Sequence, residues 1–419
     1  MLEPLSYTHR PIGAKLSHDG AERRLLCYVK KIGYTLASTE ETGMRRTFGG
    51  LIGILFLLSC GSKQSQVDRI YENGVEVVLN HIEPYHIKGQ PSKLSLEKVF
   101  SIDLEREDFA KAGLLSGGEW DADDDGNIFI VGFKNRENFI YRFDHAGHMM
   151  GSFGRRGQGP GELLGPSLSG VYGREIVLSD FAGMKYVEYD LDGRVIREKR
   201  LGHPDRLCPL GNGKLVGFGP RPDPAAKAFY YALTLCDAEF NEVQVLDRYE
   251  FPSDDSRLYP FFMWRVSGDR IILANEARGY ELLVYDIDGR LVRKIRKEYR
   301  PIRVTDAIKE AILGPDYRKS ESSQSKYFPD PLPPLNQFFA DDEGRIFVMT
   351  YESGLNPGEY IWDIFNPDGV FIGRKALNIV WAGLYLGSRY TFAKKGRLYC
   401  HREKESGFHE LVVYKMIWK

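Results

Sequence analysis

The residues best suited to ligand chemistry in this sequence are aromatic side chains that stand beside charged or amide side chains. An aromatic ring offers a flat apolar surface and its polar neighbours offer directional hydrogen bonds, which together serve sugar or peptide recognition. We take ten residues as candidate ligand-binding positions: Glu119, Trp120, Arg155, Arg156, Glu162, Arg206, Trp264, Arg265, Glu276 and Asn336. A wider set from the same predicted loops comprises Lys134, Arg136, Gln158, Asn275, Tyr351, Glu352 and His401. For any one of them the alternative is that the side chain is a solvated loop residue or packs in the wall of the channel.

Two of the candidates, Trp120 and Trp264, each begin or lie in a predicted strand next to a charged residue, Glu119 and Arg265 respectively. We predict that each indole exposes a large rigid face, the kind of surface that forms binding hot spots. The alternative is that both rings fill gaps between structural repeats, in which case truncating them would lower stability.

Signals for catalysis or metal binding are weak. The sequence has no G-x-S-x-G or H-E-x-x-H motif, and its nine histidines are scattered. Residues 121–132 match the first half of an EF-hand calcium loop, but the twelfth position is Gly132, where a bidentate Glu would clamp the ion. We therefore expect an Asp-rich hairpin turn, with adventitious calcium as the alternative. We assign no catalytic residue, no metal ligand and no cofactor, and favour a non-enzyme.

Six copies of a short turn that ends in glycine, each leading into an apolar strand, indicate the architecture. The landmark glycines are on average about 54 residues apart: Gly126, Gly173, Gly213, Gly268, Gly344 and Gly396. That spacing suits four short strands with their loops, and such a unit buries its faces only by stacking on its own copies. The sequence predicts an all-β, six-bladed β-propeller of four-stranded blades over residues 94–419.

The two ends of the repeat array complement each other. The last repeat stops after its third strand, and an alternating apolar segment at residues 99–104 precedes the first repeat. We expect this N-terminal strand to complete the last blade and close the ring, because closure leaves no open sheet edge. The wide gap before Gly344 carries an insertion with a predicted helix over residues 305–313.

Composition limits the partners and the redox chemistry. The 57 basic and 58 acidic residues nearly cancel, and without a basic block we expect no nucleic-acid partner. Downstream of residue 60 the cysteines are Cys208, Cys236 and Cys400, an odd number without C-x-x-C spacing. This argues against a disulfide framework or a zinc site and favours core packing, with a Cys208–Cys236 bridge as the alternative.

The region around residues 44–60 has the order of a secretion signal: Met44-Arg45-Arg46, a short apolar run at 48–58, then Ser59 and Cys60. It resembles the lipobox of bacterial lipoproteins, which implies cleavage before Cys60 and lipid attachment to it. The alternative is a buried helix with an ordinary cysteine. We interpret residues 1–43 as an over-called translation start, or else a genuine extension, and residues 61–93 as a tether and lead-in to the propeller.

The segment Gly154-Arg155-Arg156-Gly157-Gln158-Gly159-Pro160-Gly161-Glu162 follows a Phe-Asp-x-x-Gly turn, Phe143 to Gly147. With that turn it resembles the signature of the six-bladed β-propeller lipoproteins of Gram-negative bacteria, which are related in style to NHL-repeat propellers. The resemblance covers roughly residue 94 to the C-terminus, with a second matching stretch at 328–348. It implies a lipid-anchored envelope protein, on the periplasmic or surface face, and supplies no substrate. The glycines themselves suit a tight connection between blades.

We therefore expect a monomeric propeller of the cell envelope, attached through a lipid anchor and placed at the outer membrane. Its expected function is to bind a glycan, a peptide or a partner protein at the mouth of the channel. There the inter-blade loops converge with the loops between second and third strands. The alternative function is a propeller hydrolase or lyase, lactonase-like, with a metal in the channel.

Overall fold

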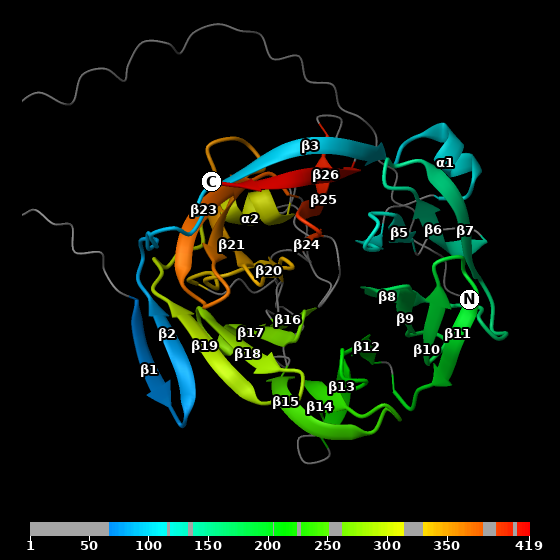
Figure 1. The fold of residues 1–419 in the computed structure, drawn as a ribbon, viewed down its shortest axis with the longest axis horizontal. Helices are drawn as coiled ribbons and strands as arrows, with labels where there is room; N and C mark the ends of the chain where they lie inside the picture. Colours follow the sequence, from blue (N-terminus) through cyan, green and yellow to red (C-terminus); the bar gives the residue numbers. More distant parts are fainter. Residues whose placement is uncertain are drawn as a thin grey trace, which may run out of the picture. The chain divides into compact units, whose positions relative to one another are not determined.

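The computed structural model describes residues 67–114, 118–132, 137–203, 205–223, 228–250, 262–313, 330–379, 391–404 and 409–419. Six sheets stand around a ring (Figure 1). The predicted signal segment with Cys60, the residues before it, and Lys134 and Arg136 lie outside the described residues. Within the described residues, no helix is both long enough and apolar enough to cross a membrane.

Five blades are each built from four consecutive antiparallel strands, the first innermost as predicted, and the sheet of blade 4 carries two further strands (Figure 1). Blade 1 consists of β4 (Glu119–Ala122), β5 (Ile128–Val131), β6 (Asn138–Phe143) and β7 (Met149–Arg155). Blade 2 consists of β8 (Pro166–Tyr172), β9 (Glu175–Asp180), β10 (Lys185–Asp190) and β11 (Val195–Arg200). Blade 3 consists of β12 (Arg206–Pro209), β13 (Leu215–Asp223), β14 (Ala228–Cys236) and β15 (Glu242–Glu250). Blades 4 and 5 are β16 (Phe262–Ser267), β17 (Arg270–Asn275), β18 (Glu281–Asp286) and β19 (Leu291–Lys297); and β20 (Gln337–Ala340), β21 (Ile346–Ser353), β22 (Tyr360–Phe365) and β23 (Phe371–Leu377). The protein is a six-bladed β-propeller.

The sixth blade confirms the predicted closure. It combines β24 (Thr391–Lys394), β25 (Arg397–Glu403) and β26 (His409–Trp418) with the N-terminal strand β3 (Leu94–Asp103). Strand β3 pairs with β26 along almost its whole length, from Asp103 opposite Glu410 to Leu94 opposite Trp418. The segment predicted at residues 99–104 is thus the outer strand of the last blade, and its pairing joins the two ends of the array.

The lead-in segment differs from the expected tether. Strands β1 (Asp68–Glu72) and β2 (Val75–Asn80) form a hairpin, and β2 pairs in parallel with β19, so the sheet of blade 4 has six strands. Asn80 fixes the hairpin between two blades: its Nδ2 donates to the carbonyls of Arg296 and Gly369, and its Oδ1 accepts from the Phe371 backbone N–H at 2.8 Å. The hairpin belongs to the same compact unit as the blades. The lead-in segment therefore contributes a hairpin to the sheet of blade 4, ahead of the closing strand that begins at Leu94.

The repeated aspartate in the hairpin turns has a plain structural purpose. The Asp144 carboxylate accepts from the backbone N–H groups of Ala146 and His148, two and four residues ahead, at 2.9 and 2.8 Å. These bonds satisfy donors that the tight turn would leave unpaired, which is why the motif recurs. The same pattern occurs at Asp123, Asp190, Asp237, Asp286, Asp341 and Asn366.

Helices are few among the described residues, and apolar side chains fill the spaces between blades. In the described ranges the helical segments are α1 (Glu107–Lys111), the 3-10 turn η1 (Glu276–Arg278) and α2 (Asp306–Leu313), the last as predicted for the insertion. The cysteines Cys208, Cys236 and Cys400 are buried and free, so the expectation of core packing is confirmed and the alternative Cys208–Cys236 bridge is wrong.

Candidate functional site

Glu119 and Arg206, two predicted ligand-binding residues, form a buried ion pair on the inner strands of blades 1 and 3. Only 2% of Glu119 and 5% of Arg206 are exposed. The second oxygen of Glu119 accepts from the Ser167 hydroxyl at 2.7 Å and from the Leu168 backbone N–H at 2.6 Å, both on β8. The pair therefore connects three consecutive inner strands, and its hydrogen bonds are used within the protein.

Trp120 exposes no face, which corrects the prediction of an open aromatic platform. Successive side chains of a strand point to opposite sides, so Trp120 points away from Glu119 and Asp121. Its ring is fully buried and makes edge contacts with Phe392, Tyr399 and His401 of blade 6, with centroids 5.6 to 5.8 Å apart. Trp120 packs between the first and last blades.

Trp264 is likewise buried, with 3% of its surface exposed, and it packs in the cluster between blades 3 and 4. Its Nε1 and the Oδ1 of Asn336, a residue 7% exposed, have no hydrogen-bond partner among the described residues. Arg265 donates from Nη1 to the Trp264 carbonyl at 2.9 Å. Buried polar atoms of this kind are normally satisfied by a partner, by water or by a ligand. The Trp264 Nε1 and Asn336 Oδ1 atoms are thus buried polar atoms that no other described residue satisfies.

The glycine-rich segment is a structural connection between blades 1 and 2. Arg155 Nε donates to Glu162 at 2.9 Å, and the other Glu162 oxygen accepts from the Gly159 backbone N–H at 2.9 Å. A Cβ at Gly157 would lie 1.9 Å from that carboxylate, and Gly161 has φ 68°. The Arg156 guanidinium lies 4.5 Å from the centroid of the Phe139 ring. The spacing of this motif therefore shapes a turn.

The Asp-rich loop at residues 121–132 uses its oxygens for the hairpin. Asp123 accepts from the backbone N–H groups of Asp125 and Asn127 and from the Asn127 side chain, at 2.7 to 3.0 Å. Asp121 accepts from the Val171 backbone N–H at 2.8 Å on the next blade. These hydrogen bonds engage oxygens that a calcium ion would need, so the arrangement is that of a turn.

Across the part of the chain that the structure describes, one group of His and carboxylate side chains is close enough to hold a metal ion: His203, Asp205 and Glu242. Arg221 already occupies this group, donating to both Asp205 oxygens at 2.8 Å and to Glu242 at 2.6 Å. A guanidinium that donates hydrogen bonds to both carboxylates competes with a divalent cation for the same oxygens. The group is built as an ion-pair cluster.

The candidate functional site is a hollow of about 470 Å³, which we call the proline-walled hollow. It is lined by Arg248, Tyr249, Glu250, Asn275, Glu276, Ala277, Gly279, Tyr299, Pro331, Leu332, Pro333 and Pro334. The segment 275–279 connects the second and third strands of blade 4, and 331–334 precedes the first strand of blade 5. The sequence predicts that these two kinds of loop converge at the channel mouth, and Asn336 lies two residues after Pro334.

The polar groups of this hollow are arranged around aromatic rings. Tyr299 is 39% exposed, whereas Tyr249 is buried and its hydroxyl donates to Glu276 Oε1 at 3.1 Å. Arg248 lies 4.9 Å from the centroid of the Tyr230 ring. Arg248 and Glu250 are exposed and Glu276 is half-buried, so a cation and two carboxylates surround one accessible ring.

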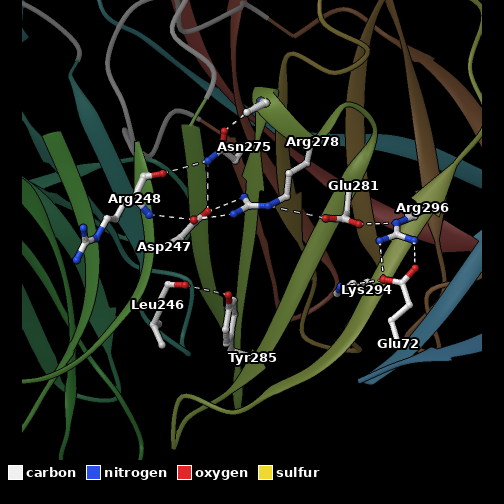
Figure 2. Close-up of polar contacts among 11 residues, drawn as sticks. Glu72, Leu246, Asp247, Arg248, Asn275, Arg278, Glu281, Tyr285, Lys294 and Arg296 are labelled. Carbon is white, nitrogen blue, oxygen red and sulfur yellow. Dashed lines mark hydrogen bonds and ion pairs between the residues drawn. The ribbon is translucent and has the colours of Figure 1, made fainter. Parts of the chain in front are cut away.

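A row of alternating charges runs from β15 to β1 and adjoins the lining residues Arg248 and Asn275 (Figure 2). Arg278 pairs with Asp247 through two hydrogen bonds of 2.6 and 2.7 Å. Glu281 lies between Arg278 and Arg296, and Arg296 and Lys294 both donate to Glu72 on β1. Asn275 is tied to the same row, because its Nδ2 donates to the Arg248 carbonyl at 3.2 Å. The row fixes β15, the 275–281 loop, β19 and the N-terminal hairpin in one arrangement.

Of the ten predicted residues, Glu276 lines this hollow, and Asn275 of the wider set lines it too. Sequence reasoning missed Arg248, Tyr249, Glu250 and Tyr299 because no repeat motif marks β15 or the residues that follow β19. The available signal was an aromatic residue near the end of an outer strand, Tyr249 within β15 and Tyr299 two residues after β19.

The fold and the site define the class of the protein as a six-bladed β-propeller with a polar and aromatic hollow at its mouth end. Residues 122–256 match the model of the family DUF5128, described as a 6-bladed beta-propeller. No curated protein matches the sequence.

Several solved structures are similar to this chain. A Bacteroides fragilis protein described as exported has 14% identity and a TM-score of 0.47, covering 81% of this chain and 99% of that one. A DUF4221 family member from Bacteroides vulgatus has 13% identity and a TM-score of 0.45, covering 79% and 99%. BamB from Moraxella catarrhalis has 12% identity and a TM-score of 0.35, covering 77% and 100%.

Proposed function

We propose that this propeller is a non-enzymatic binding module that takes a neutral glycan in the proline-walled hollow. The observation that carries the proposal is the accessible Tyr299 ring, 39% exposed, in a hollow of about 470 Å³ that Glu276 also lines. That volume lies within the range of small-molecule sites, which runs from about 300 to 1,000 Å³.

The chemistry of the lining favours a sugar over a charged ligand. Sugar rings present apolar C–H faces that pack on an aromatic ring, and hydroxyls that donate to carboxylates and accept from guanidinium groups. Glu250, Glu276 and Arg248 supply both kinds of partner, and one cation among two carboxylates gives no excess positive charge for an anion. The proline wall adds rigid apolar surface that loses little entropy on binding.

The test is a glycan array that carries neutral and sialylated oligosaccharides, probed with residues 61–419 and followed by titration of the best hit. Tyr299→Ala should weaken binding about 30-fold, equivalent to about 2 kcal/mol. Phe229→Ala is the matched control, since Phe229 is an aromatic residue 68% exposed on β14 and outside the lining. Glu276→Gln should weaken binding at unchanged melting temperature. Binding of short peptides but no glycan, or equal losses in Tyr299→Ala and Phe229→Ala, would reject the proposal.

The proposal includes attachment to the cell envelope through a lipidated Cys60. Its support is the order of basic, apolar and small residues that precedes Cys60 in the sequence. Metabolic labelling with a palmitate analogue should modify the wild type, and Cys60→Ala should lose the label completely. Label that persists in Cys60→Ala would show that the lipid is attached elsewhere.

A further inference from the structure

A second hollow, of about 400 Å³, lies between blades 5 and 6, and nothing in the proposed glycan function uses it. Its walls come from the loop between β21 and β22, from the end of β23, and from β25, β26 and β3. We call it the cationic hollow, because Lys375 of blade 5 and Arg402 of blade 6 both line it.

The floor of the cationic hollow is apolar. Leu377, Ile379 and Leu398 are between 1% and 5% exposed, and the adjoining Cys400 is fully buried. These residues belong to the core cluster of blades 5 and 6, so the floor is held rigidly by packing around Trp362. A rigid apolar floor beneath an opening can bury the apolar part of a ligand.

The charges at the rim are unequal. Glu359 is the one carboxylate in the lining, and Asn356 engages it: both oxygens accept hydrogen bonds, one from the Asn356 backbone N–H at 3.1 Å and one from its side-chain amide at 2.9 Å. The charge of Lys375 acts on Glu359, and Arg402 hydrogen-bonds to the Tyr414 hydroxyl, but among the described residues neither cation lies within ion-pair distance of a carboxylate. Two cations on facing blades thus remain available to a charged ligand.

A neutral hydrogen-bond donor lies beside these cations. Burial raises the pKa of Tyr414, which lines the hollow next to Arg402, so its phenol stays protonated and able to donate. A guanidinium with a neighbouring hydroxyl is suited to a planar carboxylate, because several donors then converge on two oxygens.

We infer that the cationic hollow binds an amphipathic carboxylate, with its carboxylate between Lys375 and Arg402 and its apolar chain over Leu377, Ile379 and Leu398. Charge complementarity selects the head group and the buried apolar floor selects the tail. This site shares no lining residue with the proline-walled hollow, so it stands or falls separately from the glycan proposal.

The test titrates residues 61–419 with sodium octanoate by calorimetry, alongside 1-octanol, octylamine and inorganic phosphate. Octanoate should bind at least about tenfold more tightly than each of the other three, since octanol lacks the charge, octylamine reverses it and phosphate lacks the tail. Equal binding of octanol would show an apolar site without anion selectivity, and equal binding of phosphate would show a plain anion site. Either result overturns the inference.

Two variants assign the binding to this hollow. Arg402→Gln and Lys375→Gln should each weaken octanoate binding about tenfold. Arg248→Gln, which removes a cation from the other hollow, should leave octanoate binding unchanged. If Arg402→Gln does not fold, Lys375→Gln still decides the question, because its charge lies at the rim. Unchanged octanoate binding in a folded Lys375→Gln variant overturns the inference.

Discussion

The proline-walled hollow and the cationic hollow use the same scaffold position in successive blades. Each is lined by the loop between the second and third strands of a blade, residues 275–279 in blade 4 and Asn356 with Glu359 in blade 5. They differ in the side chains around that loop: one hollow has an accessible tyrosine among carboxylates, and the other has two cations above an apolar floor. The shared backbone therefore leaves the ligand chemistry to the ends of the outer strands and to the inter-blade loops.

The two hollows also differ in what holds them. The proline-walled hollow adjoins the row of ion pairs from Asp247 to Glu72, which reaches the N-terminal hairpin. The floor of the cationic hollow is an apolar cluster, and one of its walls includes Leu96 of the closing strand β3. Charged support is screened by salt and lost in acid, whereas apolar support is not. The two hollows should respond differently to changes in the closing strand and in pH.

Removal of the closing strand should have the largest effect and should separate the two hollows. Deleting residues 94–103 removes the whole β3–β26 pairing and takes Leu96 from the cationic hollow. The melting temperature should fall by at least about 10 °C, because the ring is opened and β26 becomes a bare edge. Differential scanning calorimetry checks this result, and octanoate titration should show lost binding where the remainder folds. An unchanged melting temperature would contradict closure by β3.

The buried pair Glu119–Arg206 should contribute to stability and to neither hollow. Breaking a buried ion pair leaves an uncompensated charge, so Arg206→Met should lower the free energy of unfolding by about 3–5 kcal/mol. Arg155→Met is the matched control, because Arg155 is 75% exposed in its pair with Glu162, and its loss should cost less than about 1 kcal/mol. Urea unfolding measures both. A stable Arg206→Met variant with weakened glycan binding would instead restore Arg206 as a ligand-binding residue.

The selectivity of the two hollows should be reciprocal. Tyr299→Ala and Glu276→Gln should leave octanoate affinity within about twofold of wild type, while Arg402→Gln and Lys375→Gln should leave glycan affinity within the same range, because the distant sites are independent. Titration of each folded variant with both ligands provides the measurement. Loss of both ligands in one variant would mean that the hollows are coupled or that the fold is disturbed.

The repeats predicted the fold because each turn carries its own local chemistry. The aspartates at the hairpins and the glycines after them are required within a few residues, so their spacing reveals the blades and the missing strand. The hairpin β1–β2 could not be found in this way. Its parallel pairing with β19 and the three hydrogen bonds of Asn80 join residues more than 200 positions apart.

The candidate site was harder to predict than the fold. Glu119, Trp120 and Arg206 have the residue types of a binding site, but β4 and β12 lie against neighbouring inner strands, which bury all three. Glu276 was predicted because it lies in the short loop between the second and third strands of blade 4, and the repeat pattern locates that loop. Tyr299, which follows β19, and Arg402, on β25, depend on how neighbouring blades meet at their junction, and no local pattern encodes that.

The smallest expected effect concerns Glu72. Its ion pairs with Arg296 and Lys294 attach the N-terminal hairpin to the row of ion pairs that begins at Asp247. Hydrogen bonds from Arg296 and Lys294 lower the pKa of Glu72 to about 2, from an ordinary value of 4.5. Because the folded-state pKa is depressed, the stabilisation is complete above about pH 4.5 and is lost as the pH falls towards 2. Glu72→Gln should therefore lower the melting temperature by about 1–2 °C at pH 7, a small change because the pair is solvent-screened.

The difference in melting temperature between wild type and Glu72→Gln should shrink as the pH is lowered from 4.5, as calorimetry at several pH values can show. It should be reduced by high salt, and octanoate binding at pH 7 should not change, since the cationic hollow has no part in this row. A difference that stays constant down to pH 2 would mean that the Glu72 charge does not support the hairpin, and the contrast between the two hollows would then rest on their linings alone.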